Sequence, residues 1–239
     1  MRVLAWDTSS KTGVIVALES LGGELKLVSE WVFNVEAAHS EQLLWGIHQV
    51  LQSLSWKLPE VDVLGVGVGP GSFTGLRMGV TTARTLGYAL GKPLVGVSSL
   101  EVLAYPACHL IADTKKKPYL VVVRDACQGE VFALWGLPDS FQQDCLAVKK
   151  LGAILEKDIA STCFWVGLGE ARARYPELWE RLDASRELSF SFPHVMQGRA
   201  LGALVWKSYQ EGKVSPALEV YPSYFRVSNA ELKKNCVRA

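Results

Sequence analysis

The chain has 239 residues, and its 25 lysines and arginines against 24 aspartates and glutamates give a formal net charge of +1. Hydrophobic residues make up 49% and charged residues 21%, which is typical of a globular protein and excludes an intrinsically disordered chain. The near-neutral charge disfavours a protein that holds nucleic acid by itself, because neutralising phosphates takes an excess of lysine and arginine. At this length we expect one large domain or two small ones.

Neither a membrane nor a metal is indicated as a partner. No apolar run reaches the ~18 residues of a membrane-spanning helix. Asp7 comes too early for the apolar region of a signal peptide, so we expect a cytoplasmic protein with no membrane association. The five cysteines are at least 18 residues apart, which is typical of free thiols in a reducing compartment. The four histidines lack metal-ligand spacing, so no metal site is expected.

The first half of the chain predicts an antiparallel meander followed by alternating helices and strands. Apolar, β-branched runs indicate strands, and apolar residues at helical spacing indicate helices. The predicted strands are 2–6, 14–18, 26–33, 61–68 and 94–97, and the predicted helices are 40–54, 74–90 and one that begins with the capping box Ser98/Glu101. The order of elements is therefore β-β-β-α-β-α-β-α.

The second half restarts this pattern. Strands 119–124 and 130–137 flank Asp125 and a short turn, which repeats the arrangement around Asp7, 118 residues earlier. The repeat indicates an α/β fold of two actin-like lobes with the second reduced, and we expect them over 1–110 and 111–239. The C-terminal segment would pack back on the first lobe. A helix over 147–159, a strand over 163–166 and a helix over 196–210 are also predicted, whereas 168–195 has no clear pattern.

A glycine-rich segment between the fourth strand and the second helix is the first candidate site. Glycines allow close backbone approach and a helix N-terminus offers N–H donors, which suits a phosphate or carboxylate. The segment lacks the lysine of a Walker loop and the spacing of a nucleophile elbow. The alternative is a tight turn in which Ser72 or Thr74 caps the helix. The candidate anion-binding residues are Gly69, Gly71, Ser72 and Thr74.

The turn formed by Asp7, Thr8 and Ser9 is the second candidate site. In a two-lobed ATPase such a turn holds phosphates, and its carboxylate positions a metal-bound water. The alternative is a hairpin turn whose Asp and Ser bond their own backbone. The matching second turn, 125–129, has no hydroxyl side chain, so an ATPase pocket here would lack half of its phosphate-binding groups.

The composition of the two N-terminal helices is a third signal. Helix 74–90 carries a small residue at every fourth position, and helix 40–54 places Trp45 beside its apolar stripe. Each glycine costs a helix about 1 kcal/mol relative to alanine, so repeated use indicates close packing. That packing could lie inside the core or against a partner, since aromatic residues are also enriched in interfaces.

These motifs together resemble those of the TsaB (YeaZ) family. They are densest over 1–104 and thin out between 135 and 220. Trp45 stands where the family commonly has Pro, Cys127 where it often has Arg, and Phe225 where Leu is usual. The matching motifs are Asp7-Thr8-Ser9, His39-Ser40-Glu41-Gln-Leu-Leu44, Gly67-Val-Gly-Pro-Gly-Ser-Phe-Thr-Gly-Leu-Arg77, Pro93-Leu-Val-Gly-Val-Ser-Ser-Leu-Glu101, Asp125-Ala-x-x-Gly-Glu-Val131, and Tyr224-Phe-Arg226 with Ala230-Glu231.

The resemblance implies an actin/Hsp70-like (ASKHA) fold and a non-catalytic accessory role. The complex in question installs threonylcarbamoyl on the adenosine 3′ of the anticodon in tRNAs that read codons starting with A. The implied partners are a TsaD-like catalytic paralogue, a TsaE-like ATPase and a second copy of the chain, with tRNA contacted mainly through the partners. No cofactor is required by this chain, and ATP or ADP would sit at the partner junction.

The resemblance also places the TsaD or homodimer interface on the two N-terminal helices. The residues expected in it are Leu43, Leu44, Trp45, Ile47, Leu51, Leu76, Gly79, Val80, Ala83 and Gly87. The competing interpretation is an autonomous ATPase or small-molecule kinase of the same fold, whose ATP turnover would be lost on Asp7→Asn. A peptidase would need a catalytic residue order or zinc-ligand spacing that the sequence does not show.

Overall fold

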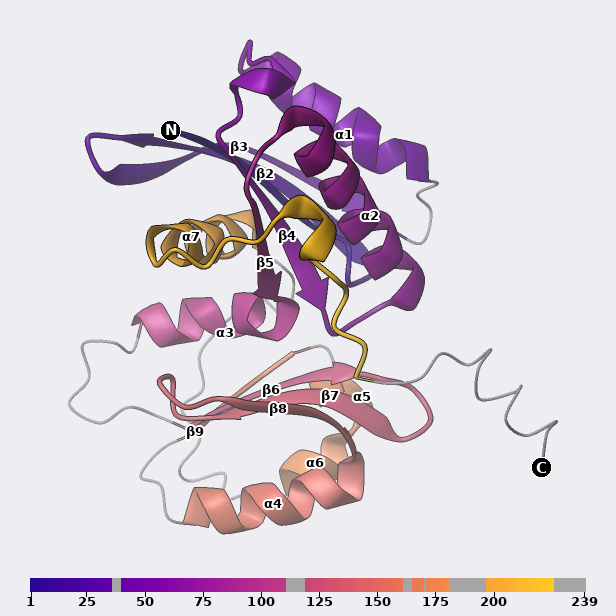
Figure 1. Ribbon diagram of the computed structural model, residues 1–239. Coiled ribbons are helices and arrows are strands. Elements are labelled where there is room, and N and C mark those ends of the chain that lie inside the picture. Colours follow the sequence, from indigo (N-terminus) through magenta and orange to yellow (C-terminus); the bar gives the residue numbers. More distant parts are fainter. Residues whose placement is uncertain (36–39, 111–118, 161–164, 170, 181–196, 226–239) are drawn as a thin grey trace, which may run out of the picture.

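The computed structural model describes residues 1–35, 40–110, 119–160, 165–169, 171–180 and 197–225 (Figure 1). The motif residues His39, Arg226 and Ala230-Glu231 lie outside this part of the chain. The strands form two sheets, ordered β3-β2-β1-β4-β5 and β8-β7-β6-β9. The first comprises β1 (Arg2–Asp7), β2 (Thr12–Leu21), β3 (Glu24–Asn34), β4 (Val63–Gly69) and β5 (Leu94–Ser98), and the second β6 (Tyr119–Asp125), β7 (Glu130–Gly136), β8 (Gln142–Ala147) and β9 (Trp165–Leu168).

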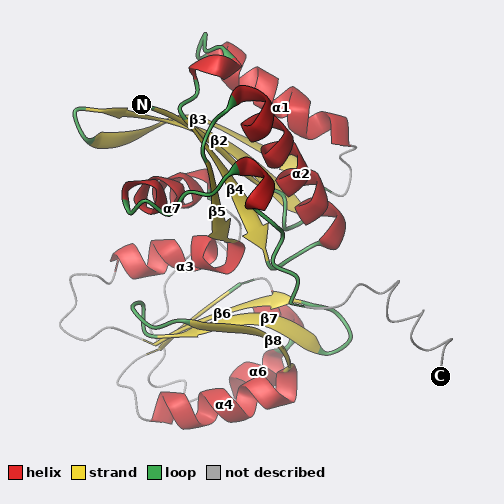
Figure 2. Ribbon diagram, viewed as in Figure 1, coloured by secondary structure: helices red, strands yellow, loops and turns green. Residues whose placement is uncertain are grey.

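Helices alternate with the sheets as layers (Figures 1 and 2). The pair α1 and α2 covers the outer face of the first sheet, α3 and α7 lie between the sheets, and α4 and α6 cover the far face of the second. A buried apolar cluster fills each interval between layers. The helices are α1 (Ser40–Ser53), α2 (Phe73–Leu90), α3 (Ser99–Leu110), α4 (Val148–Ala160), α5 (Ala171–Arg174), α6 (Pro176–Glu180) and α7 (Gly198–Gln210).

The strand pairing confirms the predicted duplicated α/β fold. In the first sheet β1 is antiparallel to β2 and parallel to β4, and in the second β6 is antiparallel to β7 and parallel to β9. Asp7 and Asp125 therefore end equivalent strands. A glycine with positive φ also ends or follows each parallel neighbour, Gly69 at +104° and Gly169 at +102°. Among the described residues the second sheet has one strand fewer than the first, which agrees with a reduced second lobe.

Strand β8 is the element that the sequence pattern missed. Its sequence, QQDCLA, is mostly polar and exposed, and β8 is an edge strand of the second sheet. The predicted strand 163–166 is β9 in the structure, and residues 161–164 lie outside the described ranges. Part of the region without a clear pattern forms the short helices α5 and α6.

The last described segment lies against the first lobe. Helix α7 contacts β1, β2 and β5, and the 3-10 turn Ala217–Glu219 contacts α2. The segment between them also bridges to the sheet, where Ser215 pairs with Leu94. The lobe boundaries at 110 and 111 stay a prediction, because residues 111–118 are outside the described part.

Candidate functional site

The turn after β1 is buried although all of its residues are polar. Asp7, Thr8 and Ser9 are at most 1% exposed. Asp7 Oδ1 accepts a hydrogen bond from the Ser9 backbone N–H at 2.7 Å, and Oδ2 accepts one from the Ser99 hydroxyl at 2.6 Å. Ser99 begins α3, so the turn is joined to the helix between the sheets. Hydrogen bonding compensates the cost of burying this carboxylate.

The glycines of the candidate anion loop and of α2 pack directly against this turn. A Cβ on Gly67 would overlap the Asp7 carboxylate, and one on Gly71 or Gly75 would overlap the backbone carbonyl of Ser9 or Thr8. The glycine series therefore makes room for the turn. The two candidate sites that the sequence predicted separately lie in contact.

The N–H donors of the glycine-rich loop serve this contact. The Ser72 N–H donates to Ser9 O at 2.7 Å, and the Gly69 N–H donates to the Ser99 hydroxyl at 3.2 Å. Ser72 caps α2 by accepting from the Gly75 N–H, which is the alternative considered for this residue. Thr74 is exposed on the first turn of α2 and joins none of these contacts. An anion at this loop stays a prediction and would have to displace protein groups.

Arg124, like Ser99, is a residue of this cluster that the sequence did not reveal. It comes from β6 in the second sheet and is 3% exposed. Its Nη1 donates to the Ser9 hydroxyl at 2.8 Å and to Pro70 O at 3.3 Å, and its Nη2 donates to Ser9 O at 3.2 Å. The guanidinium thus connects the second lobe to both candidate loops of the first. An arginine inside an apolar strand is the one signal that could have found it.

The second-lobe turn has the same local bond in a more exposed setting. Asp125 Oδ1 accepts from the Cys127 N–H at 2.9 Å, just as Asp7 accepts from the residue two positions on. Asp125 also accepts from Arg174 Nη1 at 2.5 Å and from the Tyr175 hydroxyl at 2.8 Å, and the Cys127 thiol lies 3.8 Å from its Oδ2. Burial and then the bond to Asp125 raise the pKa of Tyr175. Cys127 is exposed, with φ at +63°.

The predicted interface residues divide into a buried and an exposed group. Leu44 and Trp45 are each 52% exposed on α1. Gly79 faces Thr8 and Gly87 faces Ala217, so the small-residue stripe of α2 packs within the chain. The other buried members are Leu43, Ile47, Leu51, Leu76, Val80 and Ala83. A role of these residues in a partner interface stays a prediction, and Leu44 and Trp45 are the members that reach the surface.

A groove of 640 Å³ lies between α1, the following connection and α2. Residues at its wall include Leu44 and His48 from α1, Trp56 and Lys57 from the connection, and Leu86 from α2. Trp45 follows Leu44 in the chain and packs edge-on against Trp31 of β3, with ring centroids 5.2 Å apart.

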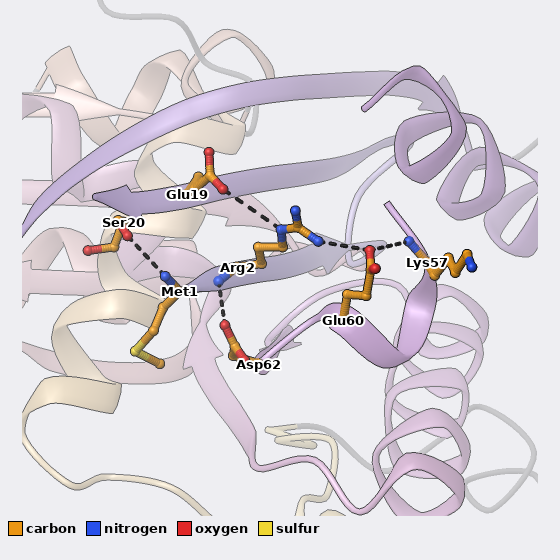
Figure 3. A network of polar contacts seen from close by, with 7 residues as sticks. All are labelled: Met1, Arg2, Glu19, Ser20, Lys57, Glu60 and Asp62. Atoms are coloured by element: carbon orange, nitrogen blue, oxygen red, sulfur yellow. Dashed lines mark hydrogen bonds and ion pairs between the residues drawn. The ribbon is translucent and has the colours of Figure 1, made fainter. Parts of the chain in front are cut away.

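A polar network fixes the connection that forms one wall of the groove (Figure 3). Arg2 Nη1 pairs with Glu60 at 2.8 Å, and the same carboxylate accepts from the Lys57 N–H at 2.9 Å. The Arg2 guanidinium also lies over the Trp56 ring, 4.7 Å from its centroid. Asp62 accepts from the Arg2 backbone N–H at 2.7 Å. The wall is therefore held in place by β1 before any partner arrives.

Across the described residues, no three histidine, cysteine, aspartate or glutamate side chains gather closely enough to hold a metal ion. None of the helices in the same ranges is both long and apolar enough to cross a membrane.

The chain is similar to proteins of tRNA modification. Residues 34–149 match the family model "TsaD: tRNA N6-adenosine threonylcarbamoyltransferase". The tRNA threonylcarbamoyladenosine biosynthesis protein TsaB of Bacillus subtilis is 34% identical over 132 residues. That alignment covers 55% of this chain and 53% of the relative, so the chain spans about half the length of the relative it matches.

Longer alignments extend the likeness over the rest of the chain. TsaB of Haemophilus influenzae is 25% identical over 95% of this chain and 94% of its own. The solved structure of YeaZ from Pseudomonas aeruginosa is 23% identical, with a TM-score of 0.72 over 93% of this chain and 99% of that one, which shows the same fold. By these matches and the duplicated fold, the chain is similar to the TsaB (YeaZ) proteins of tRNA threonylcarbamoyladenosine biosynthesis.

Proposed function

We propose that this chain is a non-catalytic accessory subunit of the bacterial complex that installs threonylcarbamoyl on the adenosine 3′ of the anticodon. It binds and supports a TsaD-like catalytic paralogue in the cytoplasm, and a TsaE-like ATPase joins the same complex. A second copy of the chain uses the same helices when TsaD is absent. The similarity to TsaB proteins of tRNA threonylcarbamoyladenosine biosynthesis supports the pathway.

The groove between α1 and α2 carries the proposal for the partner surface. It combines apolar walls from Leu44 and Leu86 with a connection that Arg2 and Glu60 already fix. A preformed wall lowers the ordering cost of association, which favours helix-in-groove docking. Leu44 and Trp45 give the partner exposed apolar side chains, of the kind that form the centre of interfaces.

The contacts of Asp7 favour the accessory role over an autonomous ATPase or kinase. Its two carboxylate oxygens accept from Ser9 and Ser99, and the turn around it is filled by the glycine-rich loop and Arg124. A phosphate and its metal would have to replace these groups. We therefore propose that ATP or ADP, where it takes part, binds at the junction with a partner, and that tRNA is held mainly by the partners.

Co-purification with the TsaD protein of the same organism tests the partner surface. Leu44→Arg places a charge at the groove and should lower the recovered TsaD at least tenfold, because a buried unpaired charge opposes docking. Val32→Arg is the matched control, since Val32 is 55% exposed on β3, away from the groove. Equal recovery of TsaD with both variants would overturn the assignment of the surface.

Nucleoside mass spectrometry tests the pathway in cells. Depletion of the chain should lower threonylcarbamoyladenosine in bulk tRNA, and expression of the Val32→Arg variant should restore it. Unchanged levels after depletion would remove the proposed function itself. Purified chain that hydrolyses ATP and loses this activity on Asp7→Asn would support the autonomous enzyme instead.

A further inference from the structure

A second exposed face of α2 lies beside the C-terminal segment instead of beside α1. We name it the Arg–Tyr face, and its members are Phe73, Arg77, Arg84, Tyr88, Tyr221 and Tyr224. In Figure 1 the gold segment that follows α7 lies beside α2, and its 3-10 turn Ala217–Glu219 contacts that helix. None of its residues lines the groove described above. The face is therefore separate from the proposed TsaD surface.

Each arginine of this face is stacked on an aromatic ring. The Arg77 guanidinium lies 3.8 Å from the Phe73 ring centroid, and its Nε donates to the Tyr224 hydroxyl at 3.3 Å. The Phe73 and Tyr224 rings themselves pack 5.2 Å apart. These contacts fix the arginine, so less entropy is lost when its remaining N–H groups bind a ligand.

Arg84 repeats the arrangement two turns along the helix. Its guanidinium lies 4.7 Å from the Tyr221 ring centroid, and its Nη2 donates to Leu218 O at 3.0 Å. Within the described ranges, neither Arg77 nor Arg84 has a carboxylate at ion-pair distance, although Glu219 lies in the neighbouring turn. Both arginines thus keep their charge and most of their donors for a partner.

The two arginines are not needed to hold the C-terminal segment against the first lobe. The Ser223 N–H donates to Val68 O at 2.7 Å, Ala217 packs under Gly87, and Val220 packs on Gly96. These backbone and apolar contacts already hold the segment on the lobe. Meanwhile Tyr88 and Tyr221 are 71% and 63% exposed, an unusual degree for large aromatic rings.

We propose that the Arg–Tyr face binds a short unpaired stretch of RNA. Exposed tyrosine rings stack on bases of any sequence, and guanidinium groups pair with phosphates, which together form the usual surface for single strands. An acidic peptide would use the two charges but leave the flat rings without a matching group. The sequence that follows this face, 226–239, adds four basic residues against one acidic residue, which favours a polyanion.

This contact is compatible with a net charge of +1. Two arginines neutralise only a few phosphates, so the binding is weak in the isolated chain and supplements a grip that the partners supply. The inference rests on the proposed function only in that RNA is the substrate of that pathway. It concerns a different surface, so either can fail alone.

Fluorescence anisotropy of the full chain with a labelled, unpaired RNA oligonucleotide of mixed sequence tests the proposal. For two neutralised phosphates, the logarithm of the association constant should fall with the logarithm of salt with a slope of about −1.4. Tyr88→Ala combined with Tyr221→Ala should weaken binding about tenfold through lost stacking. Arg77→Gln combined with Arg84→Gln should remove most of the salt dependence.

Removal of the same charge elsewhere provides the matched control. Lys149→Gln combined with Lys150→Gln, on the exposed side of α4, should leave the affinity and the salt slope unchanged. An equal loss with this pair would mean general electrostatic attraction and would overturn the site. Equal binding of a labelled poly-glutamate peptide would identify an acidic protein surface and would also overturn the RNA assignment. All variants of the Arg–Tyr face should still co-purify TsaD, which separates this test from the test of the TsaD surface.

Discussion

The two lobes contain the same turn in opposite surroundings. Asp7 and Asp125 end equivalent strands and each accepts from the N–H two residues later. Asp7 is fully buried among hydroxyls and glycines, whereas Asp125 is partly exposed and pairs with Arg174, whose side chain is 59% exposed. A duplicated fold can therefore keep the backbone of a turn while changing what fills the space beside it.

The segments that follow the parallel strands account for the difference. After β4 the chain passes Gly71 and enters α2, and its glycines admit the first turn at contact distance. After β9 it passes Gly169 and enters α5, from whose end Arg174 reaches Asp125. The glycine-rich segment packs closely on the first turn and buries it. At the second turn the neighbouring group is the long side chain of Arg174, and that turn stays partly exposed to solvent. The comparison predicts unequal responses to matched substitutions.

Gly75→Ala in α2 should produce the largest effect. An alanine Cβ would overlap the Thr8 carbonyl, a backbone atom that cannot move aside, so we expect a loss of about 3 kcal/mol or more in the free energy of unfolding. This sign opposes helix propensity, which alone would favour alanine by about 1 kcal/mol. Urea unfolding monitored by circular dichroism measures it.

Gly129→Ala provides the comparison at the second turn, in which Gly129 itself lies. Gly129 has open space around its Cβ position and a φ of +76°, so the cost is about 1 kcal/mol of backbone strain. Equal losses for the two variants would contradict the difference in packing between the turns.

Arg124→Ala should produce the next largest effect, because it removes the hydrogen bonds of the guanidinium to Ser9 and Pro70. Hydrogen bonds to charged groups contribute about 1.5–3 kcal/mol each. After the surrounding groups relax, the free energy of unfolding should fall by about 3 kcal/mol. The lobes should also unfold less cooperatively, which differential scanning calorimetry would register as a broadened or split transition. Arg174→Ala, which removes an exposed ion pair, should cost under about 1 kcal/mol. A sharp single transition at unchanged temperature in Arg124→Ala would refute the connection.

The sequence predicted the order of elements because apolar periodicity marks strands and helices that bury one face. It missed β8 because an exposed edge strand has no such pattern. Glycine spacing indicated close packing around α2 but not its occupant, since a glycine does not specify which group fills the space beside it. Arg124 and Ser99 escaped notice because their partners lie 115 and 92 residues away. Contacts between residues so far apart in the chain depend on how the folded elements are placed relative to one another, which sequence periodicity does not give.

Asp7→Asn and Asp125→Asn compare the two carboxylates directly. In Asp7→Asn, an amide NH₂ replaces one of the oxygens that accept from Ser9 and Ser99. Two buried donors then face each other, which should lower the free energy of unfolding by about 2–3 kcal/mol. In the second, solvent can satisfy the amide and the exposed pair with Arg174 contributes little, so about 1 kcal/mol is expected. Chemical denaturation of both variants at neutral pH measures the difference. A larger loss in Asp125→Asn would reverse the assignment of the two environments.

Thiol reactivity gives the smallest and most local comparison. Burial raises the pKa of the Cys108 thiol on α3 to about 11, so at pH 8 only about one thiol in a thousand is in the reactive thiolate form. Cys127, exposed in the second-lobe turn, should react with iodoacetamide before Cys108, as followed by peptide mass spectrometry. Because the thiolate is the nucleophile, raising the pH from 8 to 9 should speed the labelling of Cys108 about tenfold while the fold persists. Cys127→Ser should abolish the fast modification in its own peptide and leave the rate at Cys108 unchanged. If Cys108 were labelled as fast as Cys127 at pH 8, the helical layer between the sheets would have to open readily. The predicted contrast between this layer and the exposed second turn would then be wrong.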